Sequence, residues 1–509
     1  MTTQYLALTG VSEDDLHYPD RPEDPPSAPH SIDPETLICD LPLTIDEWPL
    51  ELPPKPLMLH LVDIFFTYYP NSRRILHRPT FMIQILANPT STSFPFIPLL
   101  HAICAAAAIY SPLVETVPPP CLHADNIFPG QTLVDRGHNL SFEEQHIILC
   151  EYQCRLAARE GENLLSVIQS CVIGAWWAFS CAQWFDFWNM SSFAMRLCVA
   201  LGLNFVDSPQ SPLPGKIREK VLIGPPRSNV EVELRRNIFW LTYCLERYHL
   251  FSSPWVFDIS DEDIHQTLPG TLDAFESGFD DGQERQNILS RDLFSIHHSN
   301  QDDFTMYVKC AIMLSRVHVF ELRRLPDFQT IEDAQNSHDM KDLELMISSL
   351  RQSIKKRVDL SNQPSIPAVS NSFIAYIAPF WATVRINTYL ANWQDPGCEA
   401  ANKALSASRA ILRYTSGLTT TSFSMNLLDV VVCVPWLAAG KALVFALEHA
   451  PESLAPILRA EIRLARDYLS TPGGRVMLFS RQKYSFDNDI VGILGEREAT
   501  RVFNDTAVS

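Results

Sequence analysis

The feature that most constrains this chain is a predicted helix at residues 231–250 that is apolar around most of its circumference. Its apolar side chains recur at helical spacing and include Leu234, Ile238, Phe239, Trp240, Leu241, Tyr243 and Leu245. Such a pattern predicts a helix that is buried on nearly all sides. Pro254 prevents its continuation, because proline lacks a backbone N–H and clashes with the preceding turn. The fold must therefore enclose this helix in a larger core.

Helical periodicity extends along most of the chain, and glycine is scarce, at 18 of 509 residues. This scarcity argues against the Gly-rich phosphate loops of nucleotide-binding α/β enzymes. We expect further helices at 57–68, 98–110, 142–160, 164–181, 185–203, 302–323, 340–359, 370–393, 397–415, 424–449 and 453–470. Trp381, Trp393 and Trp436 are expected core anchors, each needing a partner for its indole N–H. The sequence predicts an all-α protein, a large multi-helix array.

The N-terminal segment differs from the rest in composition. Residues 1–54 contain twelve Asp or Glu, one Arg and ten prolines, which predicts a disordered acidic segment. Within it, residues 37–52 alternate acidic and bulky apolar side chains, a composition found in activation segments, although a solvated acidic linker is the simpler interpretation. We further expect an N-terminal helical half at 55–270, a mobile loop at 271–300, and a C-terminal helical half at 301–500 packed on the first.

Charge and cysteine usage limit the partners of the chain. The net charge of −19 disfavours a chain that grips nucleic-acid phosphates, so we expect no direct specific DNA binding. Twelve scattered cysteines favour reduced, buried thiols in an intracellular protein. The N-terminus lacks the pattern of a secretion or transit signal. The apolar run at 94–114 is interrupted by prolines and that at 430–440 is short, so we expect no membrane span.

One helical face has spacing suited to metal ligands. His146, Cys150 and Cys154 follow one another at four-residue intervals, as ligands on one helix face would. A structural zinc site needs a fourth ligand and commonly a C-x2-C partner, which this chain lacks. We therefore interpret the three as a stripe of small side chains facing another helix, and assign no metal.

Two other polar groups invite a functional interpretation. His77 and Arg78 could be a base beside a phosphate clamp, but we interpret them as a turn whose side chains bond to nearby backbone, with Thr80 near a helix start. Asp261 and Asp263 could serve acid–base chemistry, but we interpret them as carboxylates that cap a helix start. We assign no catalytic, cofactor-binding, metal-binding or DNA-binding residue.

Three stretches together resemble a known family. Residues 75–81 read Ile-Leu-His-Arg-Pro-Thr-Phe, and a later helix supplies Trp188, Ala194, Arg196, Leu201, Gly202 and Leu203. The third stretch supplies Glu233, Arg235, Arg236, Phe239, Trp240, Tyr243, Glu246, Arg247, Ile259, Ser260, Asp261, Glu262, Asp263, Ile264, Leu268 and Pro269. Over residues 57–269 the chain is similar to the regulatory middle region of fungal zinc-cluster transcription factors. It departs from the family at Glu246, where Asp is usual, and at 252–254, where Gly-Arg-Pro is usual.

The resemblance implies a helical nuclear regulator of transcription in a fungus, not an enzyme, controlling a metabolic or biosynthetic gene set. Its expected partners are the transcription machinery or a DNA-binding protein, and a small-molecule effector. The family's six-cysteine zinc module is absent from this sequence, so either the chain acts through partners, or the module was lost or left off. Two rival interpretations remain, a helical enzyme or small-molecule-binding protein on the same fold, and a structural adaptor.

Overall fold

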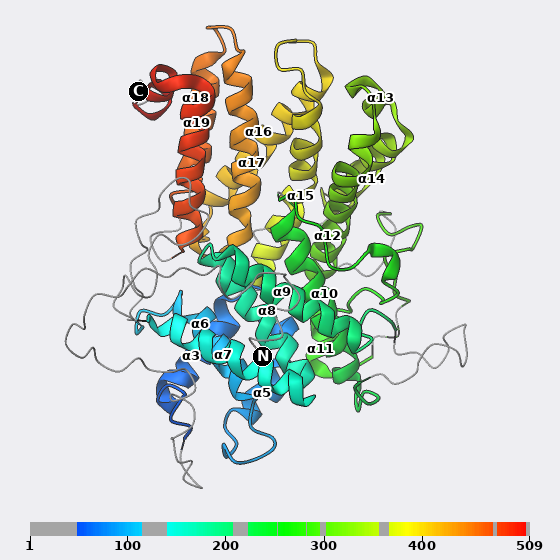
Figure 1. The fold of residues 1–509 in the computed structure, drawn as a ribbon, viewed down its shortest axis with the longest axis vertical. Helices are drawn as coiled ribbons and strands as arrows, with labels where there is room; N and C mark the ends of the chain where they lie inside the picture. The colour runs from blue at the N-terminus through cyan, green and yellow to red at the C-terminus, as the bar shows by residue number, and fades with distance from the viewer. Residues whose placement is uncertain are drawn as a thin grey trace, which may run out of the picture. The chain divides into compact units, whose positions relative to one another are not determined.

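The predicted central helix is present as α10, Asn229–Leu250, in the computed structural model of the chain (Figure 1). The structure describes residues 48–114, 140–206, 222–251, 253–280, 282, 284–295, 302–355, 366–471 and 476–504. Ser228 begins α10 by accepting a hydrogen bond from the backbone N–H of Glu231 (3.2 Å). Every residue from Asn237 to Leu250 is buried, which confirms the predicted burial on nearly all sides.

The helices that precede α10 form a first group in the described part of the chain. They are α3 Lys55–Tyr68, α4 Ser72–Ile75, α5 Arg78–Gln84, α6 Ile97–Ala108, α7 Phe142–Glu160, α8 Leu164–Ser180 and α9 Trp184–Ala200. α6 packs against α3, α7 and α8, and α10 lies against α4, α8 and α9. The small side chains of the Ala-rich α6 are buried and let its neighbours approach closely.

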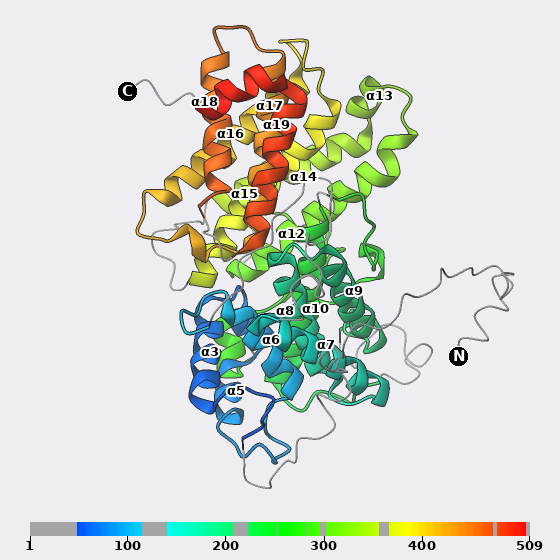
Figure 2. The same cartoon turned by 60° about the vertical axis from the view of Figure 1, so that its left-hand side comes forward.

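The segments after α10 form a second group of helices. They are η2 Asp261–Asp263, α11 Leu272–Ser277, α12 Asp303–Val319, η3 Phe320–Arg324, η4 Leu325–Asp327, α13 Ile331–Asn336, α14 His338–Lys355, α15 Ile366–Leu390, α16 Glu399–Thr419, η6 Met425–Leu427, η7 Val430–Val432, α17 Cys433–Glu448, α18 Ala455–Tyr468 and α19 Met477–Asn504. Figures 1 and 2 show α15–α19 side by side in yellow to red. α12 connects the two groups, because it packs against both α10 and α15.

The all-α prediction is confirmed over the described residues, which contain no strand and only an isolated bridge between Thr267 and Asn287. Trp381 and Trp436 are buried core anchors as predicted, and Trp436 Nε1 donates to Thr415 Oγ1 (2.9 Å). Trp381 Nε1 finds no partner in the described part of the chain. The prediction was wrong for Trp393, which is only half-buried and stacks on Phe445 at the end of a helix.

Two predicted intervals fall in parts of the chain that the structure describes incompletely. The acidic segment 1–54 lies outside the described residues except for its last seven. The interval 271–300 contains α11 and buries Phe275, Ile288 and Leu293. The mobility of that interval and the domain boundaries stay predictions.

One apolar stretch is longer than the sequence interpretation allowed. Val430–Glu448 spans 19 residues with a mean hydropathy of 2.1, because the apolar run continues past Lys441. It is therefore long enough to cross a bilayer by length and composition. However, 78% of the stretch is buried in the protein, and its main helix α17 packs against α16, α18 and α19. We interpret it as a core helix.

The contact between α17 and α19 can be tested at Gly440. A Cβ there would lie 2.5 Å from the ring of Phe486, which is fully buried. Gly440→Ala should therefore lower the free energy of unfolding by about 1–3 kcal/mol through overpacking, measured by urea unfolding. Gly417→Ala is the matched control, because no atom lies within 4 Å of its Cβ, and should raise stability by about 0.5–1 kcal/mol. A Gly440→Ala variant that is more stable than the wild type would contradict the close packing of α17 against Phe486 of α19.

Candidate functional site

The candidate site is organised around Arg247, which is fully buried in the last turn of α10. Its Nη1 pairs with the carboxylate of Glu246. Its Nη2 donates to the backbone oxygen of Ile259 (2.6 Å) and lies 3.4 Å from Asp261 Oδ1. A buried charge is tolerated only when it is paired and hydrogen-bonded in this way. Arg247 therefore fastens the turn that follows α10 back onto the helix.

Two aromatic rings sandwich the same guanidinium group. The central guanidinium carbon of Arg247 lies 4.1 Å from the ring centroid of Tyr243 and 4.2 Å from that of Phe257. Both distances are within the range of a cation–π attraction. Nε of Arg247 nevertheless has no hydrogen-bond partner in the described part of the chain. The side chain is thus held rigidly with one donor unused.

Asp261 accepts hydrogen bonds from side chains on two helices, α10 and α12. It accepts hydrogen bonds from the Tyr243 hydroxyl (2.9 Å) and from the Ser315 hydroxyl of α12 (3.0 Å), in addition to its contact with Arg247. The predicted capping role is wrong for Asp261, since Ser260 occupies the N-cap position of η2 and its side chain makes no capping bond. Tertiary donors from α10 and α12 have replaced the local one. Asp263 is exposed.

A cavity of about 320 Å³ opens beside this cluster. Its walls come from the end of α10, the turn 256–262, residues 288–289, α12 and η3. Basic side chains on the walls are Arg247, Arg316 and Arg323, and apolar side chains include Phe257, Ile288 and Leu322. A mostly apolar pocket with a few placed polar groups is typical of a small-molecule site, and this volume lies at the small end of that range. η3 is a π-helix, a rare element that is frequent at functional sites.

The positive charge of the cavity comes from arginine and not from histidine. His318 is buried and hydrogen-bonds through Nε2 to the backbone oxygen of Trp255 (2.8 Å). Burial lowers the pKa of His318, so this imidazole is neutral at pH 7. Arg316 donates to the backbone oxygen of Ile288 (2.9 Å) and forms no ion pair with a described carboxylate. No carboxylate in the described part of the chain compensates its charge directly.

A larger hollow of about 750 Å³ lies near α5, the start of α8 and residues 222–235. Two of its polar side chains, those of Gln169 and Arg235, are already engaged within the protein. Gln169 Nε2 donates to the Ile75 oxygen (2.6 Å), and Arg235 pairs with Glu231 (2.6 Å). We therefore regard the smaller cavity as the better candidate.

The His77 turn has the predicted structural role. His77 is the N-cap of α5, where Nδ1 accepts from the Thr80 backbone N–H (3.4 Å), and its Nε2 lies 3.1 Å from the Glu276 oxygen. Arg78 is exposed and lies over the ring of Phe66 (5.7 Å). Neither side chain lines the smaller cavity.

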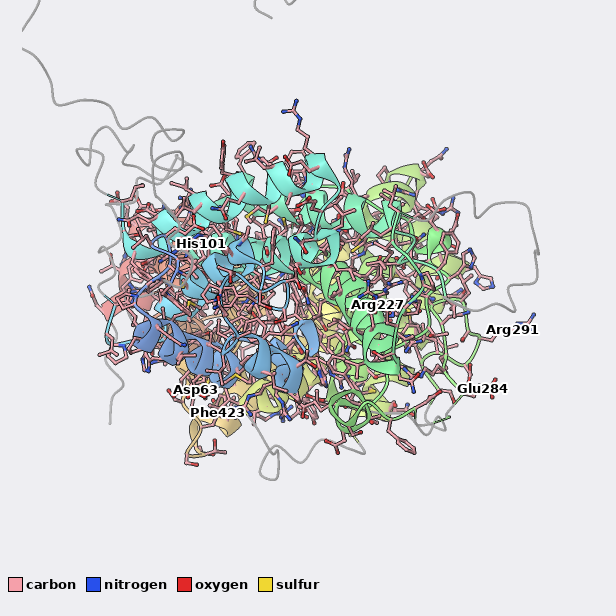
Figure 3. All side chains as sticks on the ribbon, turned by 90° about the horizontal axis from the view of Figure 1, so that it is seen from below. Asp63, His101, Arg227, Glu284, Arg291 and Phe423 are labelled. Carbon is pink, nitrogen blue, oxygen red and sulfur yellow. The ribbon has the colours of Figure 1, made fainter. Side chains whose placement is uncertain are left out.

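The metal-like stripe lies in the interior, where α7 packs on α6 and α8 as expected. The Sγ atoms of Cys150 and Cys154 are 4.0 Å apart, and His146 Nδ1 lies 2.8 Å from Nδ1 of His101 on α6. Figure 3 labels His101 among the enclosed side chains, in contrast to the exposed Glu284 and Arg291 at the edge. Among the described residues, no group of three His, Cys, Asp or Glu is placed to hold a metal ion. The two histidines form a hydrogen-bonded pair.

With this geometry in place, comparison with known proteins defines the class. The profile of the fungal specific transcription factor domain matches residues 62–322, about half of the chain. The chain belongs to this family, which confirms the predicted resemblance. The match contains the candidate cavity except for Arg323.

The curated proteins that the chain resembles also carry names of transcription factors or regulators. The chain is 31% identical over 166 residues to the negative regulator of pleiotropic drug resistance STB5 of Candida glabrata, covering 32% of this chain and 15% of that protein. It is 28% identical over 211 residues to an uncharacterised transcriptional regulatory protein of Schizosaccharomyces pombe, covering 40% and 18%. It is 26% identical over 221 residues to the Zn(2)-C6 fungal-type transcription factor FTF1c of Fusarium oxysporum, covering 43% and 20%.

These matches span about a fifth or less of each relative's own length. No solved structure matches the chain.

The buried pair of His101 and His146 should make the folded chain less stable in acid. Burial lowers the pKa of His101 to about 3 and that of His146 to about 4. Below pH 6.5 the unfolded chain therefore binds more protons than the folded one, so stability is lost as pH falls. From pH 7 to pH 5, His101 alone should cost about 2 kcal/mol. Between pH 7 and pH 5, the free energy of unfolding of His101→Leu should therefore fall by about 2 kcal/mol less than that of the wild type, as measured by urea unfolding at the two pH values.

The matched control is His265→Leu, because His265 is exposed and stacks on Phe205 without an ion pair to a described carboxylate. This variant should keep the wild-type dependence on pH. If His101→Leu also kept it, the buried pair would not be a source of acid sensitivity.

Proposed function

We propose that the chain regulates transcription in the nucleus of a fungus, controlling a metabolic or biosynthetic gene set through its helical domain and protein partners. The observation that carries this proposal is membership of the fungal specific transcription factor domain family over residues 62–322. The names of the curated relatives, which describe transcription factors or regulators, support the same role.

The proposed role is not catalytic. Arg247 and Asp261, the two most enclosed charged groups at the candidate cavity, are engaged with each other and with the backbone or hydroxyls. Groups that bond in this way position a turn, and neither is left to exchange a proton with a substrate. The alternative of an enzyme on this fold has no observation in its favour.

The proposed contact with genes is indirect. The net charge of −19 opposes tight binding to nucleic-acid phosphates, since that binding depends on neutralisation by Lys and Arg. We propose that the chain reaches its genes through a DNA-binding partner or the transcription machinery. A structural adaptor would share this surface charge, but it would not change transcription when tethered to a promoter.

Binding of a small molecule is a second function that the cavity at Arg247 supports. It is compatible with the first, because an effector bound inside a regulator can change which partners it contacts by stabilising one conformation. The alternative of a small-molecule-binding protein with no regulatory role is separated from this proposal by a transcription assay.

Tethering tests the regulatory role. The full chain fused to a heterologous DNA-binding domain should change reporter transcription several-fold in fungal cells, and activity of residues 1–54 alone would distinguish an activation segment from a solvated acidic linker. Replacing Leu41, Leu43 and Trp48 together by serine should abolish the activity of 1–54, because coactivator binding by acidic segments needs their bulky apolar side chains.

The matched control replaces three residues of the same segment that carry no bulky apolar side chain, Ser27, Ser31 and Thr44, by alanine, and should retain activation. A full-length fusion that neither activates nor represses the reporter would contradict the proposed regulation of transcription.

A further inference from the structure

We propose that the cavity beside Arg247 binds a small organic carboxylate with an apolar body. This inference goes beyond the regulatory function, because it names the chemical class of a ligand and can be tested on the purified chain without any gene.

The charge of the lining favours an anion. Three guanidinium groups, those of Arg247, Arg316 and Arg323, face two carboxylates, Asp261 and Glu262. Asp261 is already bonded to two hydroxyls and to Arg247, and Arg247 is in turn paired with Glu246. Two arginines, Arg316 and Arg323, and one exposed glutamate, Glu262, remain to interact with a ligand. Together they carry an excess positive charge. A carboxylate is the natural partner, since guanidinium binds it with paired, charge-assisted hydrogen bonds.

Arg316 is the arginine best placed to hold that carboxylate. It projects from the rigid helix α12 and is partly enclosed, with its guanidinium carbon 5.2 Å from the ring of Phe294 and its Nη2 bonded to the Ile288 oxygen (2.9 Å). These contacts fix the group and leave it without a described carboxylate. A charge held in position before binding loses less entropy when the ligand arrives.

The remaining lining favours an apolar body. Phe257, Ile259, Ile288 and Leu322 surround the cavity, and Leu289, which is 53% exposed, lies at its margin. A volume of about 320 Å³ admits a ring or a short branched chain with its carboxylate, and is small for a nucleotide or a peptide. The walls belong to both the turn 256–262 and the α12–η3 segment, so a ligand would join two elements and stabilise the folded chain.

Binding can be measured on the full chain by ¹⁹F NMR titration with 4-fluorophenylacetate and its isosteric amide, 4-fluorophenylacetamide. The acid should bind about tenfold or more tightly than the amide, because only the acid carries a negative charge and can form an ion pair with the guanidinium group. Cyclohexanecarboxylate and propanoate should displace it, the larger acid at lower concentration. Bound acid should raise the unfolding temperature.

Two substitutions should change acid binding in opposite directions. Arg316→Gln should weaken it about tenfold or more, whereas Glu262→Gln should tighten it about threefold by removing a like charge at the exposed side. Both should leave amide binding within about twofold. Arg351→Gln is the matched control, since Arg351 is an exposed arginine over the ring of Phe380 outside the cavity, and should bind the acid as the wild type does.

Leu289→Trp is a second test that does not depend on whether Arg316→Gln folds. The larger side chain should fill the cavity from an exposed position and abolish binding of both the acid and the amide. The proposal is overturned if acid and amide bind equally, if Arg351→Gln loses as much as Arg316→Gln, if Leu289→Trp still binds, or if none of the three acids binds at about 1 mM. These results concern binding by the purified chain and do not affect the outcome of the tethering assay. Failure of the proposed ligand binding can therefore be distinguished from failure of the proposed regulatory role.

Discussion

The burial of one positive charge, on Arg247, shapes the middle of this protein. Removing a guanidinium group from water costs several kcal/mol, and the structure offsets that cost with Glu246, the Ile259 oxygen, Asp261 and two flanking rings. The contacts with Phe257, Ile259 and Asp261 join α10 to the turn after it, whereas Glu246 lies on α10 itself. Through Asp261 and Ser315 the same cluster reaches α12, which in turn packs on α15. A single side chain thus connects both groups of helices.

The other end of α10 is held by a second buried cluster with the opposite central charge. Glu233 pairs with Arg236 and with Arg285 (2.7 Å), and it accepts from the Gly270 backbone N–H (2.6 Å). The positive partners lower the pKa of Glu233 although burial, the largest single influence, opposes them. The charged residues that carry the family resemblance therefore attach α10, at each end, to the segment between 258 and 285. Their role is positional, which explains why such polar residues lie in an apolar helix.

The helices could be predicted from the sequence better than the residues that line the candidate cavity. The apolar period of residues 231–250 correctly predicted a buried helix. α19 was missed, because its polar 28-residue stretch buries few large apolar side chains besides Phe479, Phe486 and Ile490. Trp393 was misplaced, because periodicity does not reveal that a helix end lies near the surface. In the cavity, Arg247 and Arg316 are 69 positions apart, and no local spacing brings them together. Only the packing of α12 on α10 does so.

The family resemblance and the geometry meet at the end of α10, because Arg247 and the stretch Ile259–Glu262 belong to the resemblance and also line the cavity. The most direct test of this account is urea unfolding of Arg247→Met, Glu246→Gln and the double variant. Arg247→Met should lose about 3–5 kcal/mol, since it leaves a buried carboxylate unpaired, and the double variant should lose at least about 1 kcal/mol less than the sum of the single losses. A loss of less than about 1 kcal/mol in Arg247→Met, or strictly additive losses, would contradict the claim that this buried charge holds the centre of the fold together.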